Sequence, residues 1–455
     1  MNEIPNTHVL VLGYGREGQS IHRYLQAHHP ELTIGIADQK EINTVVDGNV
    51  HVHTGKEYLS SIKGYNVIIR SPGIPTSLPE LQKAREQGKW VTSATNVFFS
   101  ECPGMIIGIT GTKGKSTTTS MIADIVKMQH PDVRLVGNIG KPALDYLNSA
   151  SSSTIFVMEL SSHQLEDSRY SPHIAVVLNI VPEHLDYYDD LDHYVRAKGQ
   201  IVNHQTSQDI VIFNPTHQIL TRLLEQAKSQ KYLFSLTPGP NLFCWLEKGA
   251  IYTKKTTGQP QLVLSQEKIT TLGMGNVENT LAAVSVGLVL NIPADKIQQA
   301  VAEFKPLPHR LEKVGEVRGI TFYNDSLATI PEATMHALEA LGPNVVTLIA
   351  GGYDRGLDYT KLGQFIADKS TVHTLILFPD TGPKIWEAVR RSQGEKNDQL
   401  SHFPVQTIEE AVDLAFKHTP AGKICLLSPA AASFNLFKDY QDRGDSFKRV
   451  VLSRR

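Results

Sequence analysis

The sequence predicts an α/β protein with three domains, each built on a mostly parallel β-sheet. Short apolar runs rich in β-branched residues alternate with amphipathic stretches along the whole chain, which is the pattern of parallel β–α units. Many of these runs end in Gly, Ser, Asp or Asn, at the strand ends where ligands of open α/β sheets bind. The chain of 455 residues is long enough for roughly three domains of ordinary size.

The predicted strands follow one another from end to end and are separated by segments that favour helix. They cover residues 8–12, 33–37, 66–70, 105–110, 154–158, 174–179, 210–214, 345–350, 373–378 and 424–428. Residues 228–271 are rich in strand formers and loops, so we expect a small satellite sheet there. Breaks near residues 98–103 and at the proline-punctuated residues 305–308 predict domains over residues 1–98, 99–305 and 306–455.

Composition and charge exclude several classes of function. The formal net charge is -2 and the isoelectric point is ≈ 6.8, so no overall field attracts nucleic acid or an anionic membrane. The longest uncharged apolar segment, residues 280–292, is too short to span a membrane, and no basic signal-peptide region precedes the first strand. Cys102, Cys244 and Cys425 lack CxxC spacing and indicate reduced thiols. We expect a cytoplasmic protein without nucleic-acid or membrane partners, and a monomer because no segment marks an interface.

A glycine-rich turn follows the first predicted strand. It reads Gly13-Tyr-Gly15-Arg16-Glu-Gly18 and precedes an amphipathic segment, an arrangement that lets phosphate approach the backbone at a helix N-terminus. Asp38 ends the next strand about 20 residues later, where an acid can bond a ribose or base. The turn indicates a nucleotide site in a Rossmann-like domain, although a nicotinamide dehydrogenase or a turn without ligand would give the same pattern.

A second glycine-rich loop carries the stronger signal. The predicted strand 105–110 runs into Gly111-Thr-Lys-Gly-Lys115-Ser116-Thr117 and then into a helix. Backbone N–H groups of such a P-loop surround phosphate oxygens, its lysine reaches the β- and γ-phosphates, and its serine ligates Mg²⁺. The strict Walker spacing is absent, but the strand–loop–helix context matches. A dehydrogenase has no use for this second phosphate site.

Acidic residues follow two neighbouring strands downstream of the P-loop. Glu159 comes after the predicted strand 154–158, and Glu183 with His184 follows the strand 174–179. Carboxylate oxygens after such strands are the hard ligands that Mg²⁺ prefers. The sequence therefore predicts a magnesium site beside the P-loop.

These motifs resemble, in order and spacing, those of the Mur ligases, and the resemblance covers essentially the whole chain. The central motifs are Gly111-Thr-Lys-Gly-Lys-Ser116, Glu159-Leu-Ser-Ser162, Asn179 with His184-Leu-Asp186, and Tyr194-Val-Arg-Ala-Lys198. Further segments resemble the glutamate-adding, or MurD, branch. They are Ser71-Pro72-Gly73, Val136-Gly-Asn138-Ile-Gly140, Leu307-Pro-His-Arg310-Leu-Glu312, Asn324-Asp325-Ser326, Ala432-Ser433-Phe434 and Asp442-Arg443-Gly444. The family implies a Rossmann-like N-terminal domain, a P-loop central domain and a Rossmann-like C-terminal domain.

The resemblance implies a role for each matched residue. The UDP part of the substrate UDP-N-acetylmuramoyl-L-alanine would lie against Gly13, Gly15, Arg16, Gly18, Asp38, Ser71, Pro72 and Gly73, and its muramoyl end against Asn138, Ser161 and Gln164. ATP would be bound by Gly111, Thr112, Lys113, Gly114, Lys115, Ser116, Thr117, Asn276, Arg310 and Asp325. Glutamate would be bound by Thr329, Arg355, Ser433, Phe434 and Tyr440. The catalytic residues would be Lys115, Glu159, His184 and Lys198.

The implied reaction joins D-glutamate to the alanine carboxylate in peptidoglycan precursor synthesis. ATP first converts the carboxylate to an acyl phosphate, and two Mg²⁺ ions would be held by Ser116, Glu159, His184 and a carbamylated Lys198. Because CO₂ reacts with a neutral amine, a lowered pKa at Lys198 would favour carbamylation. The alternative for Lys198 is a solvated lysine on the surface of a helix.

Several positions depart from the pattern of the branch. Leu327 and Arg355 stand where lysines are expected, Ile330 replaces a common asparagine, and Gly275 replaces a histidine. Arginine offers a planar fork where lysine is a point charge, so the exchange at residue 355 is not neutral. These departures also resemble a variant branch that adds L-glutamate and leaves inversion to an epimerase. A ligase like folylpolyglutamate synthase shares the central domain but lacks the N-terminal nucleotide-binding unit.

Overall fold

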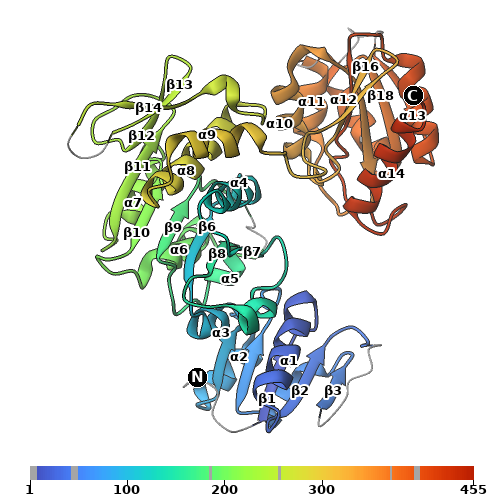
Figure 1. Ribbon diagram of the computed structural model, residues 1–455. Helices are drawn as coiled ribbons and strands as arrows, with labels where there is room; N and C mark the ends of the chain where they lie inside the picture. The colour runs from blue at the N-terminus through green and yellow to red at the C-terminus, as the bar shows by residue number, and fades with distance from the viewer. Residues whose placement is uncertain (1–7, 43–49, 184–186, 255–257, 369–370, 394–399) are drawn as a thin grey trace. The chain divides into compact units, whose positions relative to one another are not determined.

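The computed structural model describes residues 8–42, 50–183, 187–254, 258–368, 371–393 and 400–455. The chain divides into two compact units (Figure 1). The first comprises Met1–Thr270 and Met274–Phe304, and the second comprises Thr271–Gly273 and Lys305–Arg455. Three mostly parallel sheets, two in the first unit and one in the second, confirm the predicted α/β class. No helix within the described ranges is long and apolar enough to cross a membrane.

The N-terminal sheet has five parallel strands in the order β3-β2-β1-β4-β5. The strands are β1 (His8–Leu12), β2 (Thr33–Asp38), β3 (Val50–Thr54), β4 (Val67–Arg70) and β5 (Trp90–Ser93). Residues of β1 alternate between two cores: Val9 and Val11 pack with helices α1 (Arg16–His28) and α3 (Ala94–Glu101). Leu10 and Leu12 pack on the other face with η1 (Tyr58–Gly64) and α2 (Pro79–Glu86). This period of two is what a strand covered on both faces requires.

The central sheet has nine strands in the order β14-β13-β12-β11-β10-β9-β6-β8-β7. They are β6 (Met105–Thr110), β7 (Val133–Gly137), β8 (Ile155–Glu159), β9 (Ile174–Val177), β10 (Ile210–Phe213), β11 (Gln230–Ser235), β12 (Cys244–Glu247), β13 (Ala250–Thr253) and β14 (Gln261–Ser265). Pairing is parallel from β7 to β12 and antiparallel from β12 to β14. The region expected to form a satellite sheet therefore continues the edge of the central sheet.

Helices cover both faces of the central sheet. One face packs with α4 (Lys115–Lys127), α8 (Met274–Val289) and α9 (Ala294–Glu303). The other packs with η2 (Ala143–Ser149), α5 (Ser162–Leu165), α6 (Leu191–Asn203) and α7 (Gln218–Leu224). The short η3 (Gln266–Lys268) follows β14.

The N-terminal and central sheets share one apolar core. A single cluster of buried side chains runs from Val9 and Ile21 to Phe156 and Val177. At its middle, Phe98 of α3 meets Phe156 of β8 edge to face, with ring centroids 5.0 Å apart. The two sheets are therefore held together by burial of apolar and aromatic surface.

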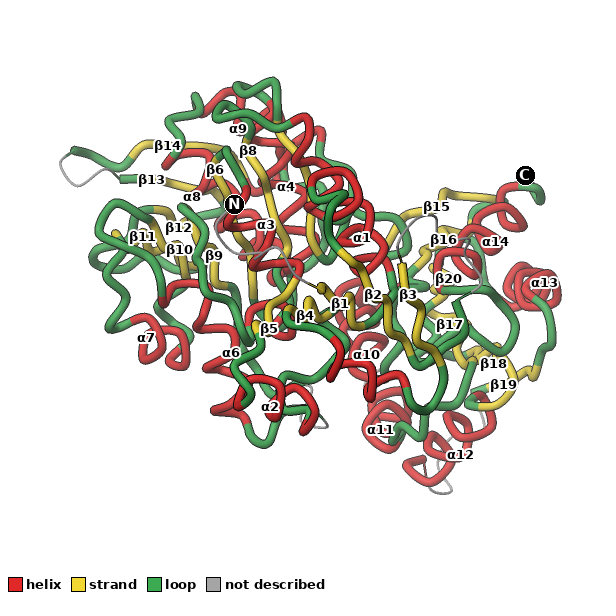
Figure 2. The backbone as a smooth tube through the Cα atoms, turned by 90° about the horizontal axis from the view of Figure 1, so that it is seen from below, coloured by secondary structure: helices red, strands yellow, loops and turns green. Residues whose placement is uncertain are grey.

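The second unit holds a six-stranded sheet in the order β15-β16-β20-β17-β18-β19. Its strands are β15 (Glu312–Val317), β16 (Ile320–Asn324), β17 (Val345–Gly352), β18 (Thr374–Asp380), β19 (Ser401–Pro404) and β20 (Ile424–Leu427), of which β15 alone is antiparallel to its neighbour. One face packs with α10 (Pro331–Leu341), α11 (Thr360–Asp368) and α12 (Gly382–Gln393), and the other with α13 (Ile408–His418) and α14 (Tyr440–Leu452) (Figure 2). A short turn, η4 (Gly342–Asn344), precedes β17.

Candidate active site

The P-loop lies at the carboxyl end of β6, between β8 and β9. Gly111 has φ 152° and Gly114 has φ 88°, and close packing also demands glycine at both positions. A Cβ would lie 2.7 Å from the Leu178 Cβ at residue 111 and 2.2 Å from the Asn279 Oδ1 at residue 114. The loop thus keeps a left-handed path that only glycine adopts without strain, and α4 begins directly after it at Lys115.

Neighbouring strand ends fix the conformation of the loop. The Lys113 amide donates to the Asn179 Oδ1 at 3.1 Å, and the Thr112 hydroxyl contacts the Val181 carbonyl at 3.1 Å. The Lys115 ammonium folds over the loop and donates to the carbonyls of Gly111 and Thr112 at 3.1 and 2.9 Å. Its charge therefore lies over the loop, as phosphate binding requires. Asn276 bonds Asn279, the residue that packs on Gly114, so the structure brings this predicted ATP residue close to the loop.

Glu159 ends β8 at the same edge of the sheet and is 1 % exposed. Its Oε1 accepts a hydrogen bond of 2.8 Å from the Asn138 side chain, whereas its buried Oε2 has no hydrogen-bond partner among the residues that the structure describes. A buried carboxylate oxygen without a partner is costly unless a cation or donor occupies the space beside it. The predicted magnesium ligand therefore has an oxygen available for a metal, with Ser116 half-buried in the first turn of α4.

Lys198 of α6 is 1 % exposed and lies beneath the P-loop. Its Nζ donates to the Gly111 carbonyl at 2.8 Å and sits 4.7 Å from the ring centroid of Tyr194. Burial and the nearby Lys115 cation hold the pKa of Lys198 well below its usual range, against the opposing charges of Glu183 and Glu159. The amine is therefore biased toward its neutral, nucleophilic form.

The fourth predicted metal ligand, His184, lies outside the described residues. Among the residues that the structure does describe, no group of three or more His, Cys, Asp or Glu side chains gathers at a metal-binding separation. The described part of the predicted set consists of Ser116, Glu159 and Lys198, and a carbamylated Lys198 would add a second anionic ligand to it.

The first glycine-rich turn, Asp38 and Ser71 converge at the edge of the N-terminal sheet. The Asp38 carboxylate accepts the Tyr14 amide at 2.7 Å, and the Ser71 hydroxyl donates to the Gly13 carbonyl at 2.7 Å. Gly13 has φ 89°, and a Cβ on Gly18 would lie 2.0 Å from the Gly13 oxygen. Gly15 precedes α1, and Pro72 and Gly73 continue the loop after Ser71. Hydrogen bonds and chain connectivity thus bring these predicted UDP residues close together.

Two side chains of α1 join this turn to the central domain. Arg16 donates to the carbonyl of Gly140, two residues beyond Asn138. Glu17, to which sequence reasoning gave no role, accepts a hydrogen bond of 2.7 Å from the Gln164 Nε2. Gln164 and Ser161 form a reciprocal N-terminal cap of α5. Burial raises the pKa of Glu17, which lines a small pocket with Gln164, Ser20, Thr95 and Gly137.

In the second unit, Asp325 follows β16 and is almost completely buried. Its Oδ2 accepts from the Ser428 hydroxyl at 2.9 Å, and its Oδ1 accepts from the Leu311 amide at 3.1 Å. Burial raises the pKa of Asp325 to about 7, and the Arg310 charge acts in the opposite direction. The structure therefore places the two predicted ATP residues of this unit near each other.

The predicted glutamate residues gather only in part. The Arg355 guanidinium lies 6.0 Å from the ring centroid of Phe434, an exposed side chain that also meets Tyr353 edge to face. Ser433, next to Phe434, is 2 % exposed, and its hydroxyl is therefore withdrawn from the surface. Thr329 and Tyr440 are half-buried, and no hydrogen bond, ion pair or ring contact joins either of them to Arg355 in the described ranges.

Arg443 of α14 contacts the loop that carries Ser433. The sequence motif that contains Arg443 did not predict this role. It is 1 % exposed and donates to the carbonyls of Ala431 and Ala432 at 3.1 and 3.2 Å and to the Ser326 Oγ at 2.9 Å. Burial lowers its pKa to about 9. This guanidinium fixes the loop that carries Ser433.

The chain is similar to known proteins over nearly its whole length. Three family models match: the Mur ligase MurD-like N-terminal domain over residues 7–93, the Mur ligase middle domain over residues 109–287, and the Mur ligase glutamate ligase domain over residues 309–431. The UDP-N-acetylmuramoylalanine–D-glutamate ligase of Acetivibrio thermocellus is 35% identical over 99% of this chain and 97% of its own. That of Koribacter versatilis is 34% identical over 99% and 98%.

Solved structures show the same fold at low identity. The UDP-N-acetylmuramate–alanine ligase MurC from Thermotoga maritima has a TM-score of 0.61 at 15% identity, covering 99% of this chain and 100% of its own. The MurF ligase from the same organism, in complex with ADP, has a TM-score of 0.59 at 16% identity, covering 98% and 95%. These relatives are ligases and not dehydrogenases, so they do not support the nicotinamide dehydrogenase alternative. The chain belongs to the Mur ligase family and is an ATP-dependent, ADP-forming ligase of peptidoglycan biosynthesis.

Proposed function

We propose that this protein joins the amine of D-glutamate to the alanine carboxylate of UDP-N-acetylmuramoyl-L-alanine. The observation that carries the proposal is the edge of the central sheet, where the P-loop, the unpartnered Oε2 of Glu159 and the buried amine of Lys198 lie together. The names of the relatives at 31–35% identity support D-glutamate as the acceptor. The surface formed by Gly13, Asp38 and Ser71 would hold the UDP part of the substrate.

The first step transfers the γ-phosphoryl group of ATP to the substrate carboxylate. A carboxylate oxygen attacks phosphorus, the bond to the β-phosphate oxygen breaks, and ADP leaves from an acyl phosphate. Both reactants are anions, so preorganised positive charge at the Lys115 ammonium is the largest contribution that this chain can make. Bound Mg²⁺ would add neutralisation of the phosphate charge, and Ser116 Oγ and the Oε2 of Glu159 would hold it.

The second step forms the amide. The neutral amine of glutamate attacks the acyl carbon, and inorganic phosphate leaves as the C–N bond is completed. The acceptor would be bound by Thr329, Arg355, Ser433, Phe434 and Tyr440, and Arg355 would pair with one of its two carboxylates. Asn276, Arg310 and Asp325 would bind ATP in addition to the P-loop.

The second metal site rests on the chemistry of Lys198. A buried lysine whose pKa is lowered by burial and by the Lys115 cation can lose its proton and add CO₂ to give a carbamate. This converts a cation into a bidentate oxygen ligand beside Glu159. We propose that this carbamate and His184 hold the second Mg²⁺, and that the carbamate appears in the mass of the intact protein under CO₂ and disappears in the Lys198→Met variant.

The three domains would span residues 1–98, 99–305 and 306–455. A cytoplasmic monomer is the proposed state, and gel filtration with light scattering at micromolar concentration tests the monomer directly.

The decisive experiment measures ADP and amide product with UDP-N-acetylmuramoyl-L-alanine and with D-glutamate or L-glutamate in separate reactions. Turnover with D-glutamate alone is expected. Turnover with L-glutamate alone would show that L-glutamate is the acceptor. Arg355 and Leu327 would then be the residues expected to determine this preference. ATP turnover with folate in place of the UDP substrate would indicate a ligase like folylpolyglutamate synthase. Lys115→Met should abolish turnover, whereas Lys127→Met at the exposed end of the same helix should leave it unchanged.

A further inference from the structure

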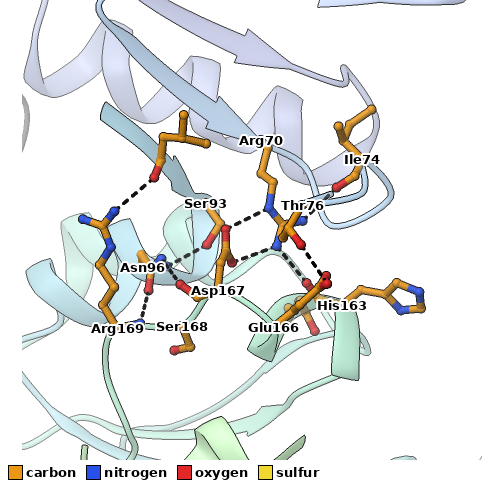
Figure 3. Close-up of polar contacts among 12 residues, drawn as sticks. Arg70, Ile74, Thr76, Ser93, Asn96, His163, Glu166, Asp167, Ser168 and Arg169 are labelled. Atoms are coloured by element: carbon orange, nitrogen blue, oxygen red, sulfur yellow. Dashed lines mark hydrogen bonds and ion pairs between the residues drawn. The ribbon is translucent and has the colours of Figure 1, made fainter. Parts of the chain in front are cut away.

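A short segment of the central domain, Glu166–Arg169, is held by side chains of the N-terminal domain. Figure 3 shows Arg70, Thr76 and Asn96 converging on it from three different parts of that domain. The segment begins directly after α5, whose cap contains Ser161 and Gln164. It therefore connects the N-terminal nucleotide surface to the residues expected at the muramoyl end of the substrate.

Arg70 is the centre of these contacts. It is the last residue of β4, is 0 % exposed, and directly precedes Ser71. Its Nε and Nη2 donate to both carboxylate oxygens of Asp167 at 2.8 and 2.7 Å. The guanidinium also donates to the Ile74 carbonyl at 3.0 Å and the His163 carbonyl at 3.1 Å. One planar group thus ties the 71–74 loop, helix α5 and Asp167 together.

Thr76 and Asn96 make further hydrogen bonds between the N-terminal domain and the segment Glu166–Arg169. The Thr76 hydroxyl donates to the Glu166 carboxylate at 2.7 Å, and the Asn96 amide donates to the Asp167 carbonyl at 3.0 Å. Asn96 also accepts from the Arg169 amide at 2.9 Å. The remaining oxygen of Glu166 accepts from the Tyr187 hydroxyl at 2.9 Å. The contacts extend in this way from the loop after β4 to the chain that leads into α6, where Lys198 lies.

A buried charge at the end of β4 is an expensive way to hold two domains together. An apolar side chain at residue 70 would continue the core of Val67, Ile68 and Ile69 without any cost of desolvation. The apolar contact of Phe98 with Phe156 already joins the two sheets. The guanidinium adds a fixed orientation, because its planar fork donates to a carboxylate and two carbonyls in one arrangement only.

We infer that Arg70, through Asp167, is a positioning residue that sets the span between the UDP-binding loop and the muramoyl-binding cap of α5. The inference rests on the proposed function, in which one long substrate occupies both ends of this span. A substrate anchored at its nucleotide presents its distant carboxylate correctly only if the two binding surfaces keep a fixed separation. A misplacement of 1 Å in such a reaction can lower the rate by about 10²-fold.

The test compares two ligands, UDP alone and UDP-N-acetylmuramoyl-L-alanine, on the full chain by calorimetry, together with kcat and KM. In Arg70→Lys and Asp167→Asn, UDP affinity should stay within about twofold, while affinity for the whole substrate falls at least about tenfold and kcat falls by about 10²-fold. Arg70→Met should lose more substrate affinity and more of kcat than Arg70→Lys, because lysine keeps a positive charge. The control is Arg134→Lys. Arg134 also donates to both carboxylate oxygens of an aspartate, Asp132, and to backbone carbonyls, but all of these partners lie within the central domain.

Three results separate the possibilities. Equal loss of affinity for both ligands, or a change in thermal stability alone, would overturn the positioning role and leave Arg70 a structural residue. Wild-type protein that binds neither ligand would refute the proposed function instead. If the Arg70 variants fail to fold, Asp167→Asn carries the test, because it preserves shape and removes only the charge.

Discussion

Replacement of Asp325 by asparagine should change how the stability of the second unit depends on pH. Burial raises the pKa of this carboxyl to about 7, from 3.8, so between these values the folded state holds a proton that the unfolded state has released. The free energy of unfolding therefore falls with rising pH across this window, by about 1.4 kcal/mol per unit and about 4 kcal/mol in all. Below pH 4 both states are protonated and the effect is absent.

The Asp325→Asn variant should remove that decline. Asparagine keeps an acceptor for the Leu311 amide and can donate to the Ser428 hydroxyl, so little hydrogen bonding is lost. At pH 8 the variant should be more stable than the wild type by up to about 4 kcal/mol, and at pH 4 the two should agree. Urea unfolding followed by the fluorescence of Trp386, whose indole lies in the second unit, measures both values.

The matched control is Asp354→Asn in the same unit. Asp354 is half-buried and its bond to Lys384 lowers the pKa of its carboxyl, so this change should not raise stability at pH 8. Parallel pH profiles for the wild type and Asp325→Asn would refute the reasoning, because they would show that Asp325 ionises normally in the folded state.

Three further predictions concern the first unit. Glu159→Gln should weaken Mg²⁺ binding and lower kcat by about 10²-fold or more, and should leave stability unchanged or raised, since the unpartnered Oε2 becomes an uncharged donor; titration with Mg²⁺ and thermal unfolding check this. Lys198→Met should abolish turnover yet melt no lower than the wild type, because it removes a buried amine whose charged form is disfavoured; a lower melting temperature with retained activity would contradict it. Phe98→Ala should cost about 3–5 kcal/mol by opening a cavity against Phe156, as measured by urea unfolding.

The structural features predicted best from the sequence are those that depend on residues close together in the chain. The P-loop was predictable because its strand, its glycines and its helix lie within one short stretch, and the left-handed φ angles of Gly111 and Gly114 require that residue type. Strand β3 was missed because its histidines at residues 51 and 53 interrupt the apolar pattern at a sheet edge. Strand β15 was missed because Gly315 and charged residues obscure its alternation.

Contacts between distant residues were beyond sequence reasoning. Arg70 and Asp167 are separated by 97 positions, and nothing near either residue indicates the other. Lys198 would pass as an exposed helical lysine, since only the packing of α6 under the P-loop buries it. Glu17 lay within a recognised glycine-rich turn, but its partner Gln164 is 147 residues away. Local pattern indicates which residues are available for chemistry, and tertiary packing determines their charge and orientation.

The apolar core that runs through the N-terminal and central sheets limits how this protein can be cut or recombined. A fragment that ends near residue 98 would expose Phe98 and the inner faces of α1 and α3, and the remaining chain would expose Phe156 and η2. Each piece would then tend to aggregate. Exchange of the nucleotide-binding region between related ligases should therefore succeed only when the opposing surface of the central sheet is exchanged with it, so that these two domains are inherited as one piece.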